Sequence, residues 1–250
     1  MTIERSILSA KKGSAVGGNG LYMSNFSGGS LTYVSYTGSV TEGYVSIANG
    51  PSCAVADSSG NLYVSRYNGS ALAKVNTSTG SVTSSWVATS ANPTYPIIDS
   101  SGNIYLTYNS GTQVDKITSS GTRTTNFITF AIDNPIAYAG ICLTPDDSTI
   151  YTVNGGKYLS NTTSSGTKTL NWATVDTNGY AGRNLIVNSS NGDIYVNNTT
   201  QGKIIKVTSA GSVNTGFYTY STSAYVWQWV RDSSGNMYGC SSASKIVKID

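Results

Sequence analysis

The chain has 250 residues, of which only 11% are charged, and it contains no histidine. A soluble domain usually has about 25% charged residues, and the formal net charge here is only +3. The lack of histidine excludes Ser-His-Asp catalysis, histidine-ligated metals and an imidazole general base, and the weak, scattered charge argues against a nucleic-acid partner.

The N-terminal segment MTIERSILSAKK lacks the apolar core of a signal peptide. No apolar run of about 18 residues follows it, so no transmembrane segment and no membrane insertion are expected. Aromatic residues make up 10% of the chain, which indicates a folded protein rather than a disordered one. Strand-forming Ser, Thr and Tyr, together with turn-forming Gly and Asn, favour an all-β fold.

One phrase recurs six times, each time around a tyrosine. The copies are GNGLYMSNF at 18–26, SGNLYVSRY at 59–67, SGNIYLTYN at 101–109, DSTIYTVNG at 147–155, NGDIYVNNT at 191–199 and SGNMYGCSS at 234–242. The shared tyrosines, which lie 41 to 46 residues apart, are Tyr22, Tyr63, Tyr105, Tyr151, Tyr195 and Tyr238. A period of about 40–45 residues is typical of one four-stranded propeller blade.

A second marker keeps the same phase. In five repeats a turn glycine is followed six residues later by an aromatic residue: Gly38 and Tyr44, Gly80 and Trp86, Gly121 and Phe127, Gly166 and Trp172, Gly211 and Phe217. Two periodic features in one phase predict a repeated structural unit. We expect both sets of aromatic residues to pack in the core.

The second repeat shows how one unit divides into strands. Apolar and alternating runs predict strands at 52–56, 62–66, 71–76 and 81–88, separated by Gly, Asn and Ser turns. Residues 89–96, with two prolines, cross to the next unit. No segment has a long period of 3.6 residues, so almost no helix is expected.

The two ends of the chain complete the predicted architecture. The sixth repeat stops after its third strand at Asp250, and residues 2–9 have no other assignment. We therefore expect residues 2–9 to pair alongside 244–250 and to close a ring of six blades, each with four antiparallel strands. The single domain 1–250 would have blades at about 13–47, 52–90, 95–130, 140–175, 184–220 and 226–250, the last completed by 2–9.

The G-N-[LI]-Y-V phrase, the preceding Asp-Ser-Ser and the period together resemble the NHL-type and streptogramin-lyase-like six-bladed β-propellers. The resemblance covers the whole chain as a fold pattern. It implies an all-β propeller, but propellers of this kind include scaffolds, peptide and RNA binders, lactonases and lyases. The fold therefore does not decide the function.

Several marked residues have structural interpretations. Asp57, Asp99 and Asp232 fit turns better than calcium loops, because the further ligands and the closing Glu of an EF-hand are absent. Cys53, Cys142 and Cys240 share no CxxC spacing and are expected to be buried free thiols. The recurring third-strand lysines, Lys74, Lys116, Lys206 and Lys248, are expected on a solvated strand face.

Function is expected in the loops, which vary between repeats. In propellers the blade-to-blade loops share a face with the loops that join strands two and three. The candidate binding residues on that face are Arg66, Tyr67, Tyr108, Asn109, Asp133, Tyr138, Asn154, Asp176, Tyr180, Arg183 and Tyr225, with Phe26 and Tyr95 beside them. Tyr and Asn suit recognition of polar surfaces, although these tyrosines could equally pack the loops against the ring.

These features favour a non-enzymatic structural or adhesive protein, by analogy a phage or other virion exterior, decoration or tail component. Its expected partners are other structural proteins of an assembly, surface glycans, or both, at a virion or extracellular surface, with no cofactor and no metal. The alternative is a metal-dependent lactonase-like or lyase-like enzyme. Against it, Glu4 and Glu42 are the sole glutamates and fall on predicted outer strands, and lyases of the resembling type depend on histidine.

Overall fold

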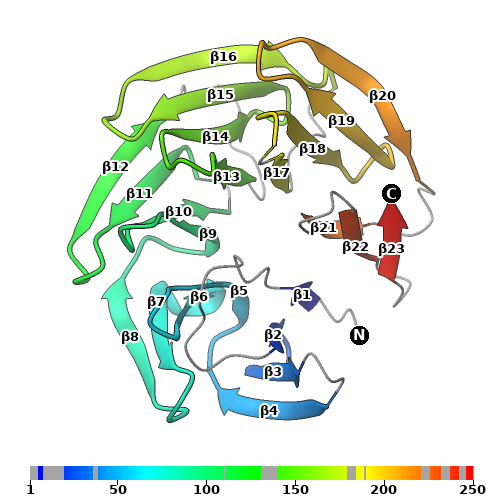
Figure 1. Ribbon diagram of the computed structural model, residues 1–250. Helices are drawn as coiled ribbons and strands as arrows, with labels where there is room; N and C mark the ends of the chain where they lie inside the picture. Colours follow the sequence, from blue (N-terminus) through cyan, green and yellow to red (C-terminus); the bar gives the residue numbers. More distant parts are fainter. Residues whose placement is uncertain are drawn as a thin grey trace. The chain divides into compact units, whose positions relative to one another are not determined.

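The computed structural model describes residues 5–7, 20–35, 39–109, 111–130, 140–178, 184–188, 190–220, 226–231, 237–241 and 246–249 (Figure 1). Over these residues the chain forms β-strands and a single short 3-10 helix, η1 (Tyr67–Gly69). The predicted all-β class is therefore confirmed. The chain divides into two compact units, Met1–Asn109 with Lys116–Thr124, and Ser110–Asp115 with Thr125–Asp250.

Three four-stranded sheets contain the strands up to residue 129. The first has the order β1 (Arg5–Ile7), β2 (Gly20–Asn25), β3 (Ser30–Ser35) and β4 (Val40–Ser46). The second contains β5 (Pro51–Ala56), β6 (Asn61–Arg66), β7 (Ala71–Asn76) and β8 (Val82–Ala88). The third contains β9 (Pro93–Ile98), β10 (Ile104–Tyr108), β11 (Gln113–Ile117) and β12 (Arg123–Thr129), and its last two strands carry residues of both units.

The second unit contains three further sheets. The fourth sheet has β13 (Ile141–Leu143), β14 (Thr149–Asn154), β15 (Tyr158–Thr163) and β16 (Lys168–Thr174). The fifth has β17 (Leu185–Val187), β18 (Ile194–Asn198), β19 (Lys203–Val207) and β20 (Val213–Thr219). The described part of the sixth has three strands, β21 (Val226–Arg231), β22 (Met237–Ser241) and β23 (Ile246–Ile249).

The N-terminal strand corrects one prediction. β1 pairs antiparallel with β2, with Arg5 opposite Asn25 and Ile7 opposite Met23, whereas β23 is paired with β22. The expectation that residues 2–9 pair alongside 244–250 is therefore wrong for the described residues, 5–7 and 246–249. The physical reason is that β2, like β6 and β10, needs an inner partner for its exposed edge, and β1 supplies it.

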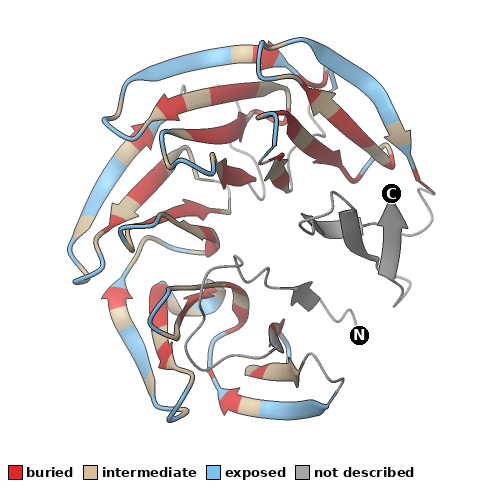
Figure 2. Cartoon of the chain, viewed as in Figure 1, coloured by how far each residue is buried: buried red, intermediate tan, exposed pale blue. Residues whose placement is uncertain are grey.

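The repeat tyrosines pack where the period predicts. Tyr22, Tyr63, Tyr105 and Tyr151 are all less than 9% exposed. Tyr63 lies in one apolar cluster with Leu72 of its own sheet and Leu106 of the next. The predicted core role is confirmed for these four tyrosines, and the clusters that contain Tyr22, Tyr63 and Tyr151 each join consecutive sheets. Figure 2 shows the resulting gradient, with buried middle strands and largely exposed fourth strands such as β16 and β20.

Packing between sheets also explains the second periodic marker, which combines a turn glycine with an aromatic residue. A Cβ added at Gly121 would lie 3.4 Å from the Trp86 ring, and one at Gly211 would lie 3.3 Å from the Trp172 ring. The fourth-strand aromatic of one sheet thus covers the turn glycine of the next sheet. These glycines also have φ angles of +93° and +89°, a region that other residues adopt only with strain.

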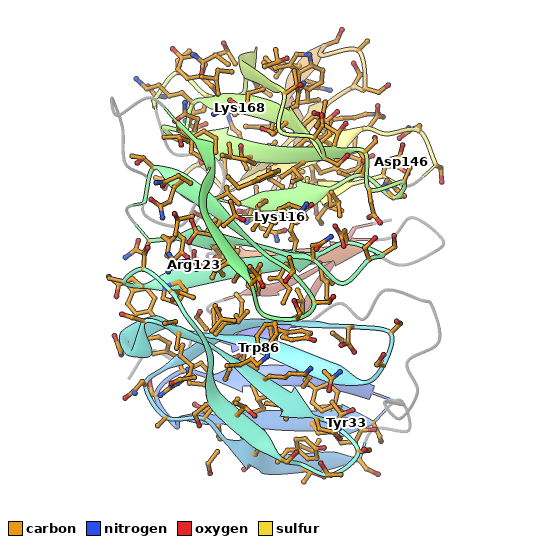
Figure 3. All side chains as sticks on the ribbon, turned by 90° about the vertical axis from the view of Figure 1, so that its left-hand side faces the viewer. Tyr33, Trp86, Lys116, Arg123, Asp146 and Lys168 are labelled. Atoms are coloured by element: carbon orange, nitrogen blue, oxygen red, sulfur yellow. The ribbon has the colours of Figure 1, made fainter. Side chains whose placement is uncertain are left out.

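The third-strand lysines pack more closely than a solvated face would require. Lys74 Nζ lies 5.5 Å from the centre of the Tyr63 ring and 5.6 Å from that of Trp86. Lys116 Nζ lies 5.4 Å from the centre of the Tyr105 ring, and Lys116 and Trp86 are labelled in Figure 3. Because the ring face attracts a cation, these lysines cover the edge of the aromatic core while their charge stays near water.

The two cysteines with described side chains agree with the prediction of buried free thiols. Cys53 and Cys142 are buried free thiols, and burial raises the pKa of Cys142 well above its ordinary value. The side chain of Cys240 lies outside the described residues. Among the described residues no helix has the length and apolar character needed to cross a membrane.

Asp57 organises the turn between β5 and β6. Its Oδ1 accepts hydrogen bonds from the backbone N–H groups of Ser59 (2.9 Å) and Asn61 (2.8 Å), and its Oδ2 accepts from Asn61 Nδ2 (2.8 Å) and Tyr63 Oη (3.0 Å). Asp99 binds Asn103 and Tyr105 in the same way. The turn role is confirmed for both residues, whereas Asp232 lies outside the described part of the chain.

Acid should weaken this turn. Burial opposes ionisation of Asp57, but the hydrogen bonds from Asn61, Tyr63 and Ser59 outweigh it and hold its pKa below 3.8. The carboxylate therefore stabilises the fold above the unfolded-state pKa of 3.8, and this contribution is lost as the pH falls through the lower folded-state pKa. At neutral pH we expect Asp57→Asn to lower the free energy of unfolding by about 1 kcal/mol, since water replaces part of the bonding at this partly exposed group.

Urea denaturation of wild type and Asp57→Asn at several pH values checks this expectation. The difference in unfolding free energy should be constant between about pH 5 and pH 8 and should shrink below about pH 4. A difference that grows on acidification would contradict the assigned role.

Candidate functional site

Two positions at the loop ends of the second strands differ between the repeats. The third residue after each repeat tyrosine, which we call the joint position, is Asn25, Arg66, Tyr108, Asn154 or Asn198 in the five repeats with described side chains. The fourth residue, which we call the row position, is Phe26, Tyr67, Asn109, Gly155 or Thr199. Since neighbouring strand residues point to opposite faces, the two positions have different surroundings.

Arg66 occupies the joint position of the second sheet and is only 7% exposed. Its Nε donates to the Ala48 carbonyl at 3.0 Å. Its Nη1 donates to the Ser84 carbonyl at 2.6 Å and to Ser85 Oγ at 3.0 Å. The guanidinium therefore ties the chain that leaves the first sheet to the fourth strand of the second, which is a structural use of its charge.

Tyr108 occupies the joint position of the third sheet and is 2% exposed. Its hydroxyl lies 3.5 Å from Nη2 of Arg123, which also donates to Ser90 Oγ at 2.7 Å. Nη1 of Arg123 donates to the Ala88 carbonyl at 3.1 Å. Arg123, labelled in Figure 3, thus joins the third sheet to the chain that leaves the second.

In the second unit, the contact at the joint position is formed by neutral amides and a carboxylate. Asn198 donates through Nδ2 to Asp176 Oδ2 at 3.1 Å. Asp176 is 8% exposed and also accepts from the Asn178 backbone N–H at 3.1 Å. Tyr220 completes the network by donating to Asn197 Oδ1 at 2.8 Å. Asp176 therefore lies inside a packed contact between the fourth and fifth sheets.

The row positions of the first three sheets form a continuous contact. The rings of Phe26 and Tyr67 meet edge to face, with centroids 5.7 Å apart and an interplanar angle of 68°. The Tyr67 hydroxyl accepts a short hydrogen bond from Asn109 Nδ2. All three side chains are partly exposed. We call these residues, Phe26, Tyr67 and Asn109, the aromatic–amide row.

Backbone contacts from the crossovers hold the row in place. The Tyr67 N–H donates to the Gly50 carbonyl at 3.0 Å, and the Asn109 N–H donates to the Asn92 carbonyl at 2.9 Å. Asn92 has a φ of 56° and Gly50 a φ of 66°, so both crossovers turn through the left-handed region. A Cβ at Gly50 would lie 2.8 Å from Phe26 Cε2, which shows how closely the backbone approaches the ring.

The Asn109 amide has an unpaired atom. Oδ1 is buried and has no hydrogen-bond partner among the described residues, while Nδ2 is bonded to Tyr67. An amide flip would exchange the two atoms, but one of them stays unpaired in either orientation. A buried polar atom without a partner costs about 1–3 kcal/mol, and because Oδ1 is buried, a ligand would reach it only after the row rearranged.

The structure separates the predicted site residues into distinct groups. Arg66, Tyr108 and Asp176 are buried in joints, whereas Tyr67 and Asn109 come together in the row. Asn154 lies in the second unit, where its Nδ2 is 3.5 Å from Asn171 Oδ1. The remaining predicted site residues lie outside the described residues: Asp133, Tyr138, Tyr180, Arg183 and Tyr225.

Phe26 also belongs to the row, although the sequence analysis placed it beside the candidate binding residues and not among them. The signal that identifies it is its alignment with Tyr67 and Asn109, four residues after a repeat tyrosine in each case. Strand alternation alone does not reveal the contact, because Phe26 and Tyr67 lie in different sheets.

A hollow of about 620 Å³ lies over one face of the first sheet and is lined by Met23, Thr32, Val34, Val40 and Glu42 among others. The equivalent residues of the second sheet include Val64 and Val75, which are fully buried against the first sheet. In the repeat this face is therefore used for packing between sheets, and the hollow is not a dedicated ligand pocket. Within the described part of the chain, no three Asp, Glu or Cys side chains gather as a metal site would require.

Comparisons with known proteins address the fold. No family model matches the sequence, and no curated protein matches it either. Virginiamycin B lyase from Staphylococcus aureus is similar in structure, with a TM-score of 0.73 and 15% identity over 99% of this chain and 84% of that one. A gluconolactonase from Xanthomonas campestris has a TM-score of 0.70 and 13% identity over 96% and 84% of the two chains.

A nutrient-binding protein from Bacteroides thetaiotaomicron is also similar, with a TM-score of 0.71 and 13% identity over 93% of this chain and 66% of that one. These structures belong to proteins with different activities, and identities this low establish the fold alone. The chain therefore shares its fold with the β-propellers of the streptogramin B lyase and gluconolactonase type.

Proposed function

We propose that this protein is a non-enzymatic, six-bladed β-propeller that serves as a structural or adhesive module on the exterior of a virion, as a decoration or tail component. The six sheets follow the six sequence repeats in order, which supports the blade count. The observation that carries the proposed role is the aromatic–amide row, because it is a partly exposed contact surface without an ionised group.

The contacts of the charged side chains support a binding role rather than a catalytic one. Arg66, Arg123 and Asp176 are the charged groups of the described joints, and all three donate to or accept from neighbouring protein groups. A general acid or base has to reach a substrate proton, and these side chains are committed to joints. The row offers a phenol, an amide and a ring, which suit recognition.

The lyase alternative lacks a necessary residue type. A histidine-to-alanine variant of the Staphylococcus aureus virginiamycin B lyase is catalytically inactive, and its structure has a TM-score of 0.75 to this chain. This chain has no histidine, so it could not use the same group. Glu42, a candidate metal ligand of a lactonase-like site, lies on the exposed fourth strand β4.

Mass spectrometry of purified particles from the source tests the proposal. We expect the chain in particles at a constant copy number relative to the main structural protein, and we expect it to remain after washing with high salt. Its absence from particles would contradict the virion role. Turnover of quinupristin or of gluconolactone by the purified protein would contradict the non-enzymatic role, with a denatured sample as the control.

A further inference from the structure

We propose that the aromatic–amide row of Phe26, Tyr67 and Asn109 is a binding subsite for a neutral saccharide. This inference rests on the proposed adhesive function and specifies its ligand class. The charge, the hydrogen-bonding groups and the strand edges at the row all favour such a ligand.

The row is electrically neutral. Arg66, which precedes Tyr67 in the chain, donates to two backbone carbonyls and one hydroxyl and is 7% exposed. Arg123 likewise donates to a carbonyl and to Ser90. A sulfated or sialylated ligand would need an available cation to pair with, so a ligand without charge fits the row better.

The hydrogen-bonding groups match a hydroxyl. Tyr67 accepts a bond from Asn109 and keeps its own O–H proton to donate. Asn109 holds this hydroxyl through Nδ2, whereas its Oδ1 is buried. A sugar hydroxyl both donates and accepts, so it can accept the hydrogen bond that Tyr67 donates. Beside them, the edge-to-face rings of Phe26 and Tyr67 offer apolar area for the C–H face of a pyranose.

Strand pairing argues against an extended peptide at the same place. β6 leads into Tyr67 and is already paired on both sides, with β5 and β7. β10 leads into Asn109 and lies between β9 and β11. Addition of a peptide strand needs a free sheet edge, and neither of these strands has one. A saccharide, which binds through side chains, does not need such an edge.

The test is a glycan array followed by isothermal titration calorimetry with the neutral oligosaccharide that binds best. Tyr67→Phe removes the hydroxyl and Asn109→Ala removes the amide, and each is expected to weaken binding by about fivefold to tenfold, the worth of one neutral hydrogen bond. Gly50→Ala should also weaken binding, since the added Cβ would displace Phe26. Thermal melting of each variant verifies that it is folded.

Two control variants make the same chemical changes at positions outside the row. Tyr158→Phe makes the same change at a partly exposed tyrosine of the second unit and should leave the affinity unchanged. Gly43→Ala introduces the same backbone strain as Gly50→Ala, because Gly43 has a φ of +60°, but its Cβ would meet nothing within 4 Å. It should therefore leave the affinity unchanged as well.

Three results would overturn the inference. The first is a preference for sulfated or sialylated glycans over neutral ones. The second is unchanged affinity in both Tyr67→Phe and Asn109→Ala. The third is a chain that is present in particles but binds no neutral glycan, or binds a protein through the row instead; the proposed function would then stand while the ligand class would fall. Enzymatic turnover, in contrast, would remove the proposed function whatever the glycan result.

Discussion

Trp86→Ala should lower the free energy of unfolding by about 3 kcal/mol, the lower end of the range for removing a packed tryptophan. The Trp86 ring packs 4.9 Å from the Tyr63 ring, centroid to centroid, beneath Lys74. It also covers Gly121 of the next sheet. The substitution therefore opens a cavity at a contact between two sheets. Urea denaturation followed by far-ultraviolet circular dichroism measures the loss without depending on tryptophan fluorescence.

Phe217→Ala is the matched control, because Phe217 holds the same position in the fifth sheet. It packs 5.3 Å from the Tyr195 ring but is 37% exposed. Less apolar area is lost on truncation, so we expect a loss of about 1 kcal/mol. Equal losses at the two positions would contradict the idea that the glycine of the following sheet completes the packing of the aromatic residue.

The sequence predicted the core well because the core repeats. A tyrosine that recurs at one phase in every unit has the same surroundings in each, and Tyr63 and Tyr105 are indeed almost fully buried. The glycine and aromatic markers were recognised as periodic, but their mutual contact was not predicted. The contact joins different sheets, and a one-dimensional period does not show which sheet follows which in space.

The N-terminal strand could not be placed from sequence. β1 is three residues long, and so short a strand fits the edge of the first sheet or of the last with the same side-chain alternation. The choice is made by backbone hydrogen bonds to β2, with Ser6 opposite Ser24. Backbone groups are the same at every residue, so the sequence carries no sign of that choice.

The candidate site was predicted in part. Tyr67 and Asn109 belong to a partly exposed contact, as their position in variable loops suggested. Arg66 was predicted as a binding residue of the loop face, yet strand alternation places it on the same face as Leu62 and Val64, which are buried. Alternation does not decide its burial, however, because β6 is buried on both faces from Leu62 to Arg66. The acceptors that allow Arg66 to be buried are backbone carbonyls, which the sequence does not mark.

Arg66→Leu tests this structural assignment and should lower the free energy of unfolding by about 3 kcal/mol. Leucine fills much of the space but leaves the carbonyls of Ala48 and Ser84 without their charged donor, and each such bond contributes about 1.5–3 kcal/mol. Both residues are exposed, so water recovers part of the loss. Arg66→Lys should recover less than half of it, because an ammonium cannot reproduce the fork of the guanidinium.

The pH dependence separates this joint from the Asp57 turn. A guanidinium stays protonated throughout the accessible range, so the cost of Arg66→Leu should be the same at about pH 4 and pH 8, whereas the cost of Asp57→Asn should fall on acidification. Arg123→Leu is the control, because its bond to Ala88 is exposed, and it should cost about 1 kcal/mol. If Arg66→Leu cost no more than Arg123→Leu, Arg66 would be available to a ligand, and the neutrality of the aromatic–amide row would no longer hold.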